Sequence, residues 1–202
     1  MFSSLLNYLS EQSSLQLSQE EILLIEKAFI PKKFKKRQFL LKAGDVCKYI
    51  CFIGKGATRQ YTVDDKGNEH VLNLSIENWW TSDRESFHKL TPSKYNIEAW
   101  EDTDVLMLPK AGGWYDKVNA IPSFAEMRKR LDDAHHMAMQ DRLHTTINYT
   151  ANYRYDELLM KYPEFIKRFP QHIIASYLGI SKETLSRIRH QAVKSKSSSK
   201  NS

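Results

Sequence analysis

The sequence predicts an α+β fold in which an antiparallel β-roll is followed by one long helix and a C-terminal helix-turn-helix. Three observations predict it. Residues 34–109 contain short apolar runs separated by turn residues, which is typical of closely spaced antiparallel strands. Residues 123–148 contain neither Gly nor Pro, which favours an uninterrupted helix. Residues 171–190 place a small residue, a glycine and a serine where two helices joined by a tight turn need them.

The strands of the roll are expected to be short, with turns at Gly44, at Gly54 to Gly56 and at Gly67. This spacing favours a roll or barrel over a doubly wound parallel sheet. The residues before the roll are expected to form short helices, because Ser18 and Glu21 have the spacing of a capping box. The expected strand runs are Phe39 to Leu41, Tyr49 to Ile53, Thr58 to Val63, Val71 to Leu74, Tyr95 to Trp100 and Val105 to Leu108.

Composition narrows the function classes. With 41% hydrophobic residues the chain can bury a core, and a formal net charge of +6 favours an anionic partner. Two cysteines, Cys47 and Cys51, are too few for a disulfide framework or an ordinary iron–sulfur cluster. The N-terminal residues lack the pattern of a signal peptide, and no apolar run approaches membrane-spanning length, so a cytoplasmic location without a membrane partner is expected. Common catalytic and metal-ligand motifs are also missing, which argues against an enzyme.

Four segments are expected: a β-roll domain at residues 1–120, a long helix at 121–149, a helix-turn-helix domain at 150–193 and a disordered tail at 194–202. Apolar and small residues of the long helix recur every three or four positions, which is typical of a seam between two helices. The alternative is a helix that lies against its own β-domain. We expect a homodimer seam formed by Phe124, Met127, Leu131, Ala134 and Ala138.

The helix-turn-helix is expected from Ala175 at the helix crossing, Gly179 in the turn and Ser181 as the cap of the second helix. Leu185 and Ile188 are expected to face the first helix. The alternative is a helical hairpin with an ordinary solvated face. Arg suits guanine, Glu suits the cytosine amino group and Lys suits phosphates, so the polar face is expected to bind double-stranded DNA. The expected DNA-contacting residues are Lys182, Glu183, Ser186, Arg187 and Arg189.

Residues 174–188 closely resemble the DNA-binding signature of the bacterial Crp/Fnr family of transcription regulators. The strand spacing and the glycine turns fit the same family. The resemblance implies a cyclic-nucleotide-binding β-roll, a dimerisation helix and a homodimer that reads a two-fold operator, with RNA polymerase as a candidate further partner. By this likeness Lys182, Glu183 and Arg187 occupy base-reading positions. The sequence departs from the family after the second helix, where a small β-wing is expected to be absent or vestigial.

The family's nucleotide pocket carries a Gly-Glu pair that binds ribose and an Arg-Ser pair that holds the cyclic phosphate. This chain has Ser82-Asp83 and Ser93-Lys94 at the corresponding places, next to Arg84. A lysine replaces the bidentate arginine contact only as a point charge. Cyclic AMP is therefore expected to bind poorly, and the protein is expected to use another effector or none, with no cofactor and no metal. The candidate ligand-binding residues are Ser82, Asp83, Arg84, Ser93 and Lys94.

Other interpretations remain open at this point. Arg84 and Lys94 would make the protein responsive to cyclic AMP if they rebuilt the phosphate clamp. Alternatively, the roll senses a small molecule while the helical region binds a protein. A metal enzyme of the cupin type is disfavoured, because the roll offers only His70 and His88. The basic run at residues 32–37 fits the solvated side of an edge strand or a nucleic-acid contact.

Overall fold

The computed structural model describes residues 1–198, and it describes side chains up to Gln191. The chain divides into two compact units. The first comprises Met1–Thr62 and Leu72–His135, and the second comprises Val63–Val71 and the chain from His136 onwards. The boundaries fall within strands β4 (Thr58–Val63) and β5 (Glu69–Ser75) and within the long helix α5 (Pro122–Asn148), so the β-roll is almost entirely in the first unit.

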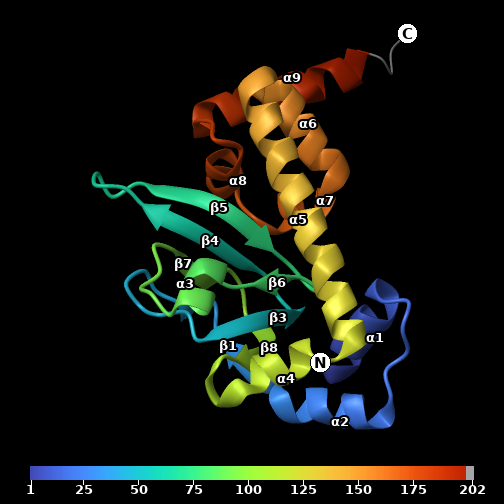
Figure 1. Ribbon diagram of the computed structural model, residues 1–202. Helices are drawn as coiled ribbons and strands as arrows, with labels where there is room; N and C mark the ends of the chain where they lie inside the picture. The colour runs from blue at the N-terminus through green and yellow to red at the C-terminus, as the bar shows by residue number, and fades with distance from the viewer. Residues whose placement is uncertain (199–202) are drawn as a thin grey trace. The chain divides into compact units, whose positions relative to one another are not determined.

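Two antiparallel four-stranded sheets form the roll (Figure 1), with the strand orders β1-β8-β3-β6 and β2-β7-β4-β5. The predicted antiparallel roll is therefore confirmed. The expected apolar strand runs did not include β1, which buries only its last residue, or β6, which has two residues. The basic run at residues 32–37, interpreted as an edge strand, overlaps β1. The strands are β1 Ile30–Phe34, β2 Phe39–Leu41, β3 Tyr49–Lys55, β4 Thr58–Val63, β5 Glu69–Ser75, β6 Trp80–Thr81, β7 Asn96–Ala99 and β8 Thr103–Pro109.

Short helices pack around the roll and share its apolar core. Ser18 begins the second of them with the predicted capping box, accepting from the Glu21 N–H while the Glu21 carboxylate accepts from the Ser18 N–H. Leu5, Leu9 and Ile25 lie in one buried cluster with strand residues of the roll. These elements are α1 Phe2–Gln12, α2 Gln19–Ala28, α3 Arg84–Lys89, the 3-10 turn η1 Ala111–Gly113 and α4 Trp114–Asn119.

Helix α5, Pro122–Asn148, begins inside this core. Phe124 and Met127 are buried in the same cluster as the strand residues, and Leu131 packs against it. Trp80 contacts Phe124 edge to face, with ring centroids 5.9 Å apart. The expectation that Phe124 and Met127 form a seam with a second copy needs correction, because their side chains are already covered by their own β-domain. Ala134 and Ala138, in contrast, are exposed.

The second unit contains four helices that follow α5 and gather around its C-terminal half (Figure 1). Two of these helices begin at a proline: Pro163 is the first residue of one, and Pro170 directly precedes the next. Proline stops helices here because it cannot donate the backbone hydrogen bond. The helices are α6 Ala151–Lys161, α7 Pro163–Arg168, α8 Gln171–Leu178 and α9 Lys182–Ser198.

Helix α9 continues to Ser198, into the segment that was expected to be a disordered tail. The sequence from Lys182 to Ser198 contains no Gly or Pro, so no residue in it forces the helix to end. The described part of the predicted tail, residues 194–198, is therefore helical. Residues 199–202 of that prediction lie outside the described residues.

Candidate nucleic-acid interface and ligand region

The C-terminal helices α8 and α9 are joined by the turn that the sequence predicted. Ala175 is 2% exposed, which leaves no room for a larger side chain on α8. Gly179 ends α8 in the left-handed conformation with φ of 66°, and its N–H donates to the carbonyls of Ala175 and Ser176. A residue with a Cβ is strained at this φ. The backbone of the turn therefore favours glycine over residues with branched side chains.

The second helix of the pair is capped and oriented by residues that the sequence singled out. The Ser181 hydroxyl accepts from the Thr184 N–H at 3.1 Å, which satisfies one of the free donors at the start of α9. Leu185 and Ile188 are 1% and 4% exposed, so the apolar face of α9 packs against neighbouring residues. The opposite face of α9 is consequently fixed toward solvent.

The predicted DNA-contacting residues divide into two groups. Lys182, Glu183 and Arg187 are exposed, whereas Ser186 and Arg189 are half-buried. None of the five makes a side-chain hydrogen bond or ion pair with another residue in the described part of the chain. Arg189 lies beside the buried face, where it lines a small hollow with Tyr155 and Ile174. The exposed face therefore brings together the three side chains at the expected base-reading positions, and Arg189 lies at its margin.

Two arginines that the sequence did not single out hold the helix before the turn. Arg142 of α5 donates to the Tyr177 carbonyl at 2.6 Å, and Arg154 of α6 donates to the Leu178 carbonyl at 2.8 Å. Both acceptors are backbone atoms. No side-chain pattern in the sequence marks such a partner, so sequence reasoning had no signal to find these residues.

In the first unit, Asp83 is the centre of the predicted ligand region. It is 5% exposed and caps α3, where it accepts from the Ser86 N–H at 3.1 Å. Its other oxygen accepts from the hydroxyl of Ser93, itself buried, at 2.7 Å. Two of the candidate ligand-binding residues therefore bind each other. The Ser86 N–H in the first turn of α3 therefore already donates to Asp83, and it is not free to bind an anionic ligand.

The cationic candidates of this region do not neutralise Asp83. Arg84 is instead paired with Asp132 of α5 at 2.5 Å, and it is half exposed. Lys94 is exposed, and Ser82 is half-buried. The pKa of the nearby His88 is lowered by its burial and by the positive charges of Lys110 and Arg84. Positive charge is thus present around α3, but it is directed at Asp132 and at solvent.

Other candidate sites are weaker. Strand β1 is at the edge of its sheet and contains the first residues of the basic run at 32–37. Lys35 of the same run pairs with Asp102 at 2.8 Å on the surface. These contacts fit the edge-strand interpretation of the run. Within the described residues no group of three or more His, Cys, Asp and Glu is arranged to hold a metal ion. The same residues include no helix that is both long and apolar enough to cross a membrane.

Residues 31–112 match the family model of the cyclic nucleotide-binding domain. The helix α3 with its Asp83 cap and the Ser93-Lys94 pair both lie inside the matched residues. No curated protein matches the sequence at a significant level.

Solved structures extend the likeness from the cyclic nucleotide-binding domain to the whole chain. FixK2 from Bradyrhizobium japonicum superposes with a TM-score of 0.68 and 16% identity, over 83% of this chain and 85% of that one. A CooA mutant from Carboxydothermus hydrogenoformans gives 0.64 and 20%, over 90% and 81%. A regulator assigned to the Crp/Fnr family from Eubacterium rectale gives 0.62 and 19%, over 88% and 85%. The fold of this chain is that of the Crp/Fnr regulators, as the resemblance implied.

Proposed function

We propose that this protein is a cytoplasmic, non-enzymatic transcription regulator that binds DNA through α9. The observation that carries the proposal is the exposed face of α9, with Lys182, Glu183 and Arg187 held outwards by a buried apolar face on the other side. An α-helix presented in this way fits the major groove, where Arg and Glu read base edges and Lys contacts phosphates.

The proposed regulator acts as a homodimer, but through a different part of α5 from the one first expected. Met139, Leu143 and Ile147 are 61%, 62% and 70% exposed. They recur every four residues, so they form one line along the second half of the helix. Large apolar side chains that line up on a surface favour association. A dimer of this kind would place two recognition helices on half-sites about 34 Å apart.

Leu143→Glu tests this seam. The substitution would bring two like charges together across a two-fold axis, and we expect dissociation in sedimentation experiments at micromolar concentration. Operator affinity should fall by more than about tenfold, because each half-site is then bound singly. The matched control is Met160→Glu, because Met160 is also a large exposed apolar residue, 79% exposed, but belongs to α6 and not to the proposed line on α5. A Leu143→Glu protein that remains dimeric would refute the seam.

We further propose that cyclic AMP does not regulate this protein. Asp83 places a buried negative charge at the first turn of α3, and Arg84 is engaged by Asp132. A charged bidentate contact contributes roughly 1.5–3 kcal/mol. Ser93-Lys94 stands here in place of the arginine pair that would make this contact, and together with the Asp83 charge this loss weakens an anionic ligand by orders of magnitude. The regulator would therefore bind its operator without added cyclic nucleotide, constitutively or under another effector.

Selection of duplexes from a randomised pool tests the DNA-binding proposal directly. We expect the purified protein to enrich a two-fold symmetric sequence in the absence of nucleotide. Calorimetry with cyclic AMP and cyclic GMP should detect no binding at micromolar concentration. Nucleotide-dependent enrichment would instead support a cyclic-AMP-responsive regulator whose clamp is rebuilt from Lys94 and Arg84. Failure to enrich any duplex would favour a sensor whose helical unit binds a protein.

A further inference from the structure

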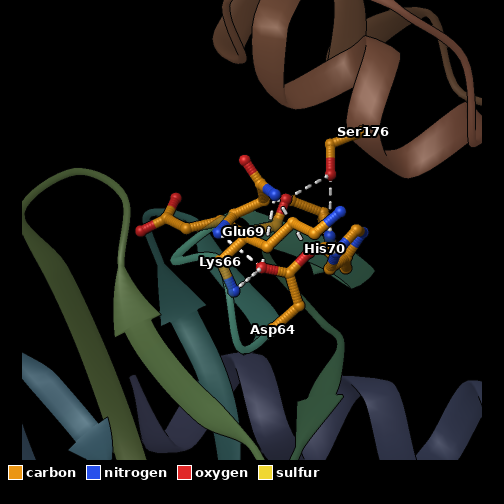
Figure 2. A network of polar contacts seen from close by, with 7 residues as sticks. Asp64, Lys66, Glu69, His70 and Ser176 are labelled. Atoms are coloured by element: carbon orange, nitrogen blue, oxygen red, sulfur yellow. Dashed lines mark hydrogen bonds and ion pairs between the residues drawn. The ribbon is translucent and has the colours of Figure 1, made fainter.

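The last turn of α8 is held by three separate parts of the second unit. The first is the tip of the β4–β5 hairpin. Ser176 accepts from the Val71 N–H at 2.9 Å, and its hydroxyl donates to the Glu69 carbonyl at 3.0 Å (Figure 2). Strand β5 is the last strand of its sheet in the described part of the chain, and its Val71 N–H and Glu69 carbonyl both bond to Ser176. The Ser176 side chain satisfies both, as a neighbouring strand would.

The hairpin tip that receives Ser176 is ordered by Asp64. Its carboxylate accepts from the backbone N–H groups of Lys66 and Asn68 at 2.9 and 2.8 Å. It also contacts the His70 ring at 2.9 Å (Figure 2). Hydrogen bonds from Asn68 and His70 lower the pKa of Asp64 well below its usual range, so the carboxylate stays charged at neutral pH. The tip is therefore a preformed surface for α8.

The other two contacts come from α5 and α6. Arg142 donates to the Tyr177 carbonyl, and its guanidinium lies 4.2 Å from the centre of the Tyr177 ring. Arg154 donates to the carbonyl of the next residue, Leu178. Positive charge near the last carbonyls of a helix is favourable. Three consecutive residues of α8 are thus each bound by a different element.

These contacts complete the hydrogen bonding of the end of α8. A helix leaves its last four carbonyls without partners inside the helix. Here the carbonyls of Ala175 and Ser176 accept from the turn, through the N–H groups of Ile180 and Gly179, both at 3.0 Å. Those of Tyr177 and Leu178 accept from the two arginines. The turn to α9 follows at once, so the last turn of α8 cannot shift without moving α9.

We propose that the last turn of α8, residues 176–178, is the joint that sets the position of the recognition helix. Ser176 and Arg142 are its positioning residues: Ser176 transmits the position of the hairpin and Arg142 that of α5. Neither touches DNA in this scheme. The inference rests on the proposed DNA-binding function, and it adds that a change in either the hairpin or α5 alters operator affinity through α8.

The test compares full-length Ser176→Ala and Arg142→Ala with the conservative variants Ser176→Thr and Arg142→Lys. Amide exchange without DNA is measured first. Ser176→Ala should speed exchange at Val71 by about tenfold, because the amide loses its acceptor, and should also speed exchange at Ile180 in the turn. Ser176→Thr, which keeps the hydroxyl, should stay near wild type. Faster exchange at Val71 with no change at Ile180 would overturn the joint.

Operator binding is measured second, with the duplex that the wild-type protein selects and a scrambled duplex. The ratio of specific to non-specific affinity should fall about fivefold for Ser176→Ala, which loses a neutral hydrogen bond. It should fall about tenfold for Arg142→Ala, which loses a charged one. The double alanine variant should lower this ratio by less than the product of the two single effects, because Ser176 and Arg142 act on the same turn. Arg142→Lys should restore part of the ratio. Ratios within about twofold of wild type for both alanine variants would overturn the proposal.

The two measurements separate the two possible failures. A wild-type protein that selects no duplex would refute the proposed function, while exchange at Ile180 would still report whether the hairpin fixes the turn. A wild-type protein that selects an operator, with variants that bind it normally, would refute only the joint.

Discussion

The polar side chains around Asp83 bond to one another inside the first unit, whereas those on the exposed face of α9 bond to no other described residue. Both regions place charged groups near a helix N-terminus. Asp83 and Ser93 are 5% and 4% exposed, while Lys182 and Arg187 are exposed. Residue type alone therefore does not identify a binding site. A side chain whose hydrogen bonds are already made has little left to offer a ligand.

The largest expected effect concerns the turn that presents α9. Gly179→Val should destabilise the second unit by about 1–3 kcal/mol, because a β-branched residue is strained at positive φ. A Cβ at this position would meet nothing closer than Arg154 at 3.9 Å, so the cost is conformational and not a clash. Gly179→Asn is the matched control, since asparagine tolerates this conformation. Thermal unfolding measures both, and a Val variant as stable as the Asn variant would contradict the assigned turn.

A comparable effect is expected in the ligand region. Asp83→Ala would leave the Ser86 N–H buried without its acceptor and would leave the Ser93 hydroxyl only the longer contact to the Tyr95 carbonyl, which costs about 1–3 kcal/mol of unfolding free energy. Asp83→Asn keeps one acceptor oxygen and should lose less. Denaturant unfolding provides the measurement. Operator affinity of the folded Asn variant should stay within about twofold of wild type. Strong binding of cyclic AMP by wild type would show that the carboxylate does not block the pocket.

On α9 itself, Arg187→Ala should weaken specific binding by about 1–3 kcal/mol and relax the preference at one base position of each half-site. Arg189→Ala supplies the contrast, because Arg189 is half-buried at the margin of the exposed face. We expect it to change specific and non-specific affinity about equally. Fluorescence anisotropy with the selected and scrambled duplexes distinguishes the two. Equal losses for Arg187→Ala would reassign that side chain to a phosphate.

The smallest effect tests whether the ligand region is closed to solvent. The Cys47 N–H donates to Ser86, next to the Asp83 cap, and burial raises the pKa of the Cys47 thiol. Burial also raises the pKa of Cys51 to about 12. The thiolate is the reactive form, so both thiols should resist alkylation at pH 8 and react fully in denaturant. Rapid labelling of the folded protein at Cys47 would indicate that the region opens.

Local sequence signals were sufficient to predict the features that depend on the backbone preferences of single residues. The capping box at Ser18, the left-handed turn at Gly179 and the helix stops at Pro163 and Pro170 each follow from a residue and its immediate neighbours. The exposed face of α9 followed from the helical period, which places Leu185 and Ile188 opposite Arg187. Strand β1 was predicted only through the basic run at residues 32–37, which was interpreted as an edge strand, because a strand with one buried residue has no apolar alternation to detect.

Tertiary structure decided the features that depend on which residues meet across the chain. The apolar spacing of α5 is the same for a helix buried in its own β-domain and for a dimer seam, and only packing shows that Phe124 and Met127 are already covered. The partner of Arg84 was equally ambiguous until Asp132 was placed beside it. The arginines that hold α8 bind backbone carbonyls, which every residue possesses. Sequence periodicity was enough to predict most of the helices and strands and the exposed face of α9, because these depend on residues that are close together in the chain. The hydrogen bonds between Asp83 and Ser93 and the contacts of the last turn of α8 could be found only from the tertiary structure, because contacts between distant residues leave no local pattern in the sequence.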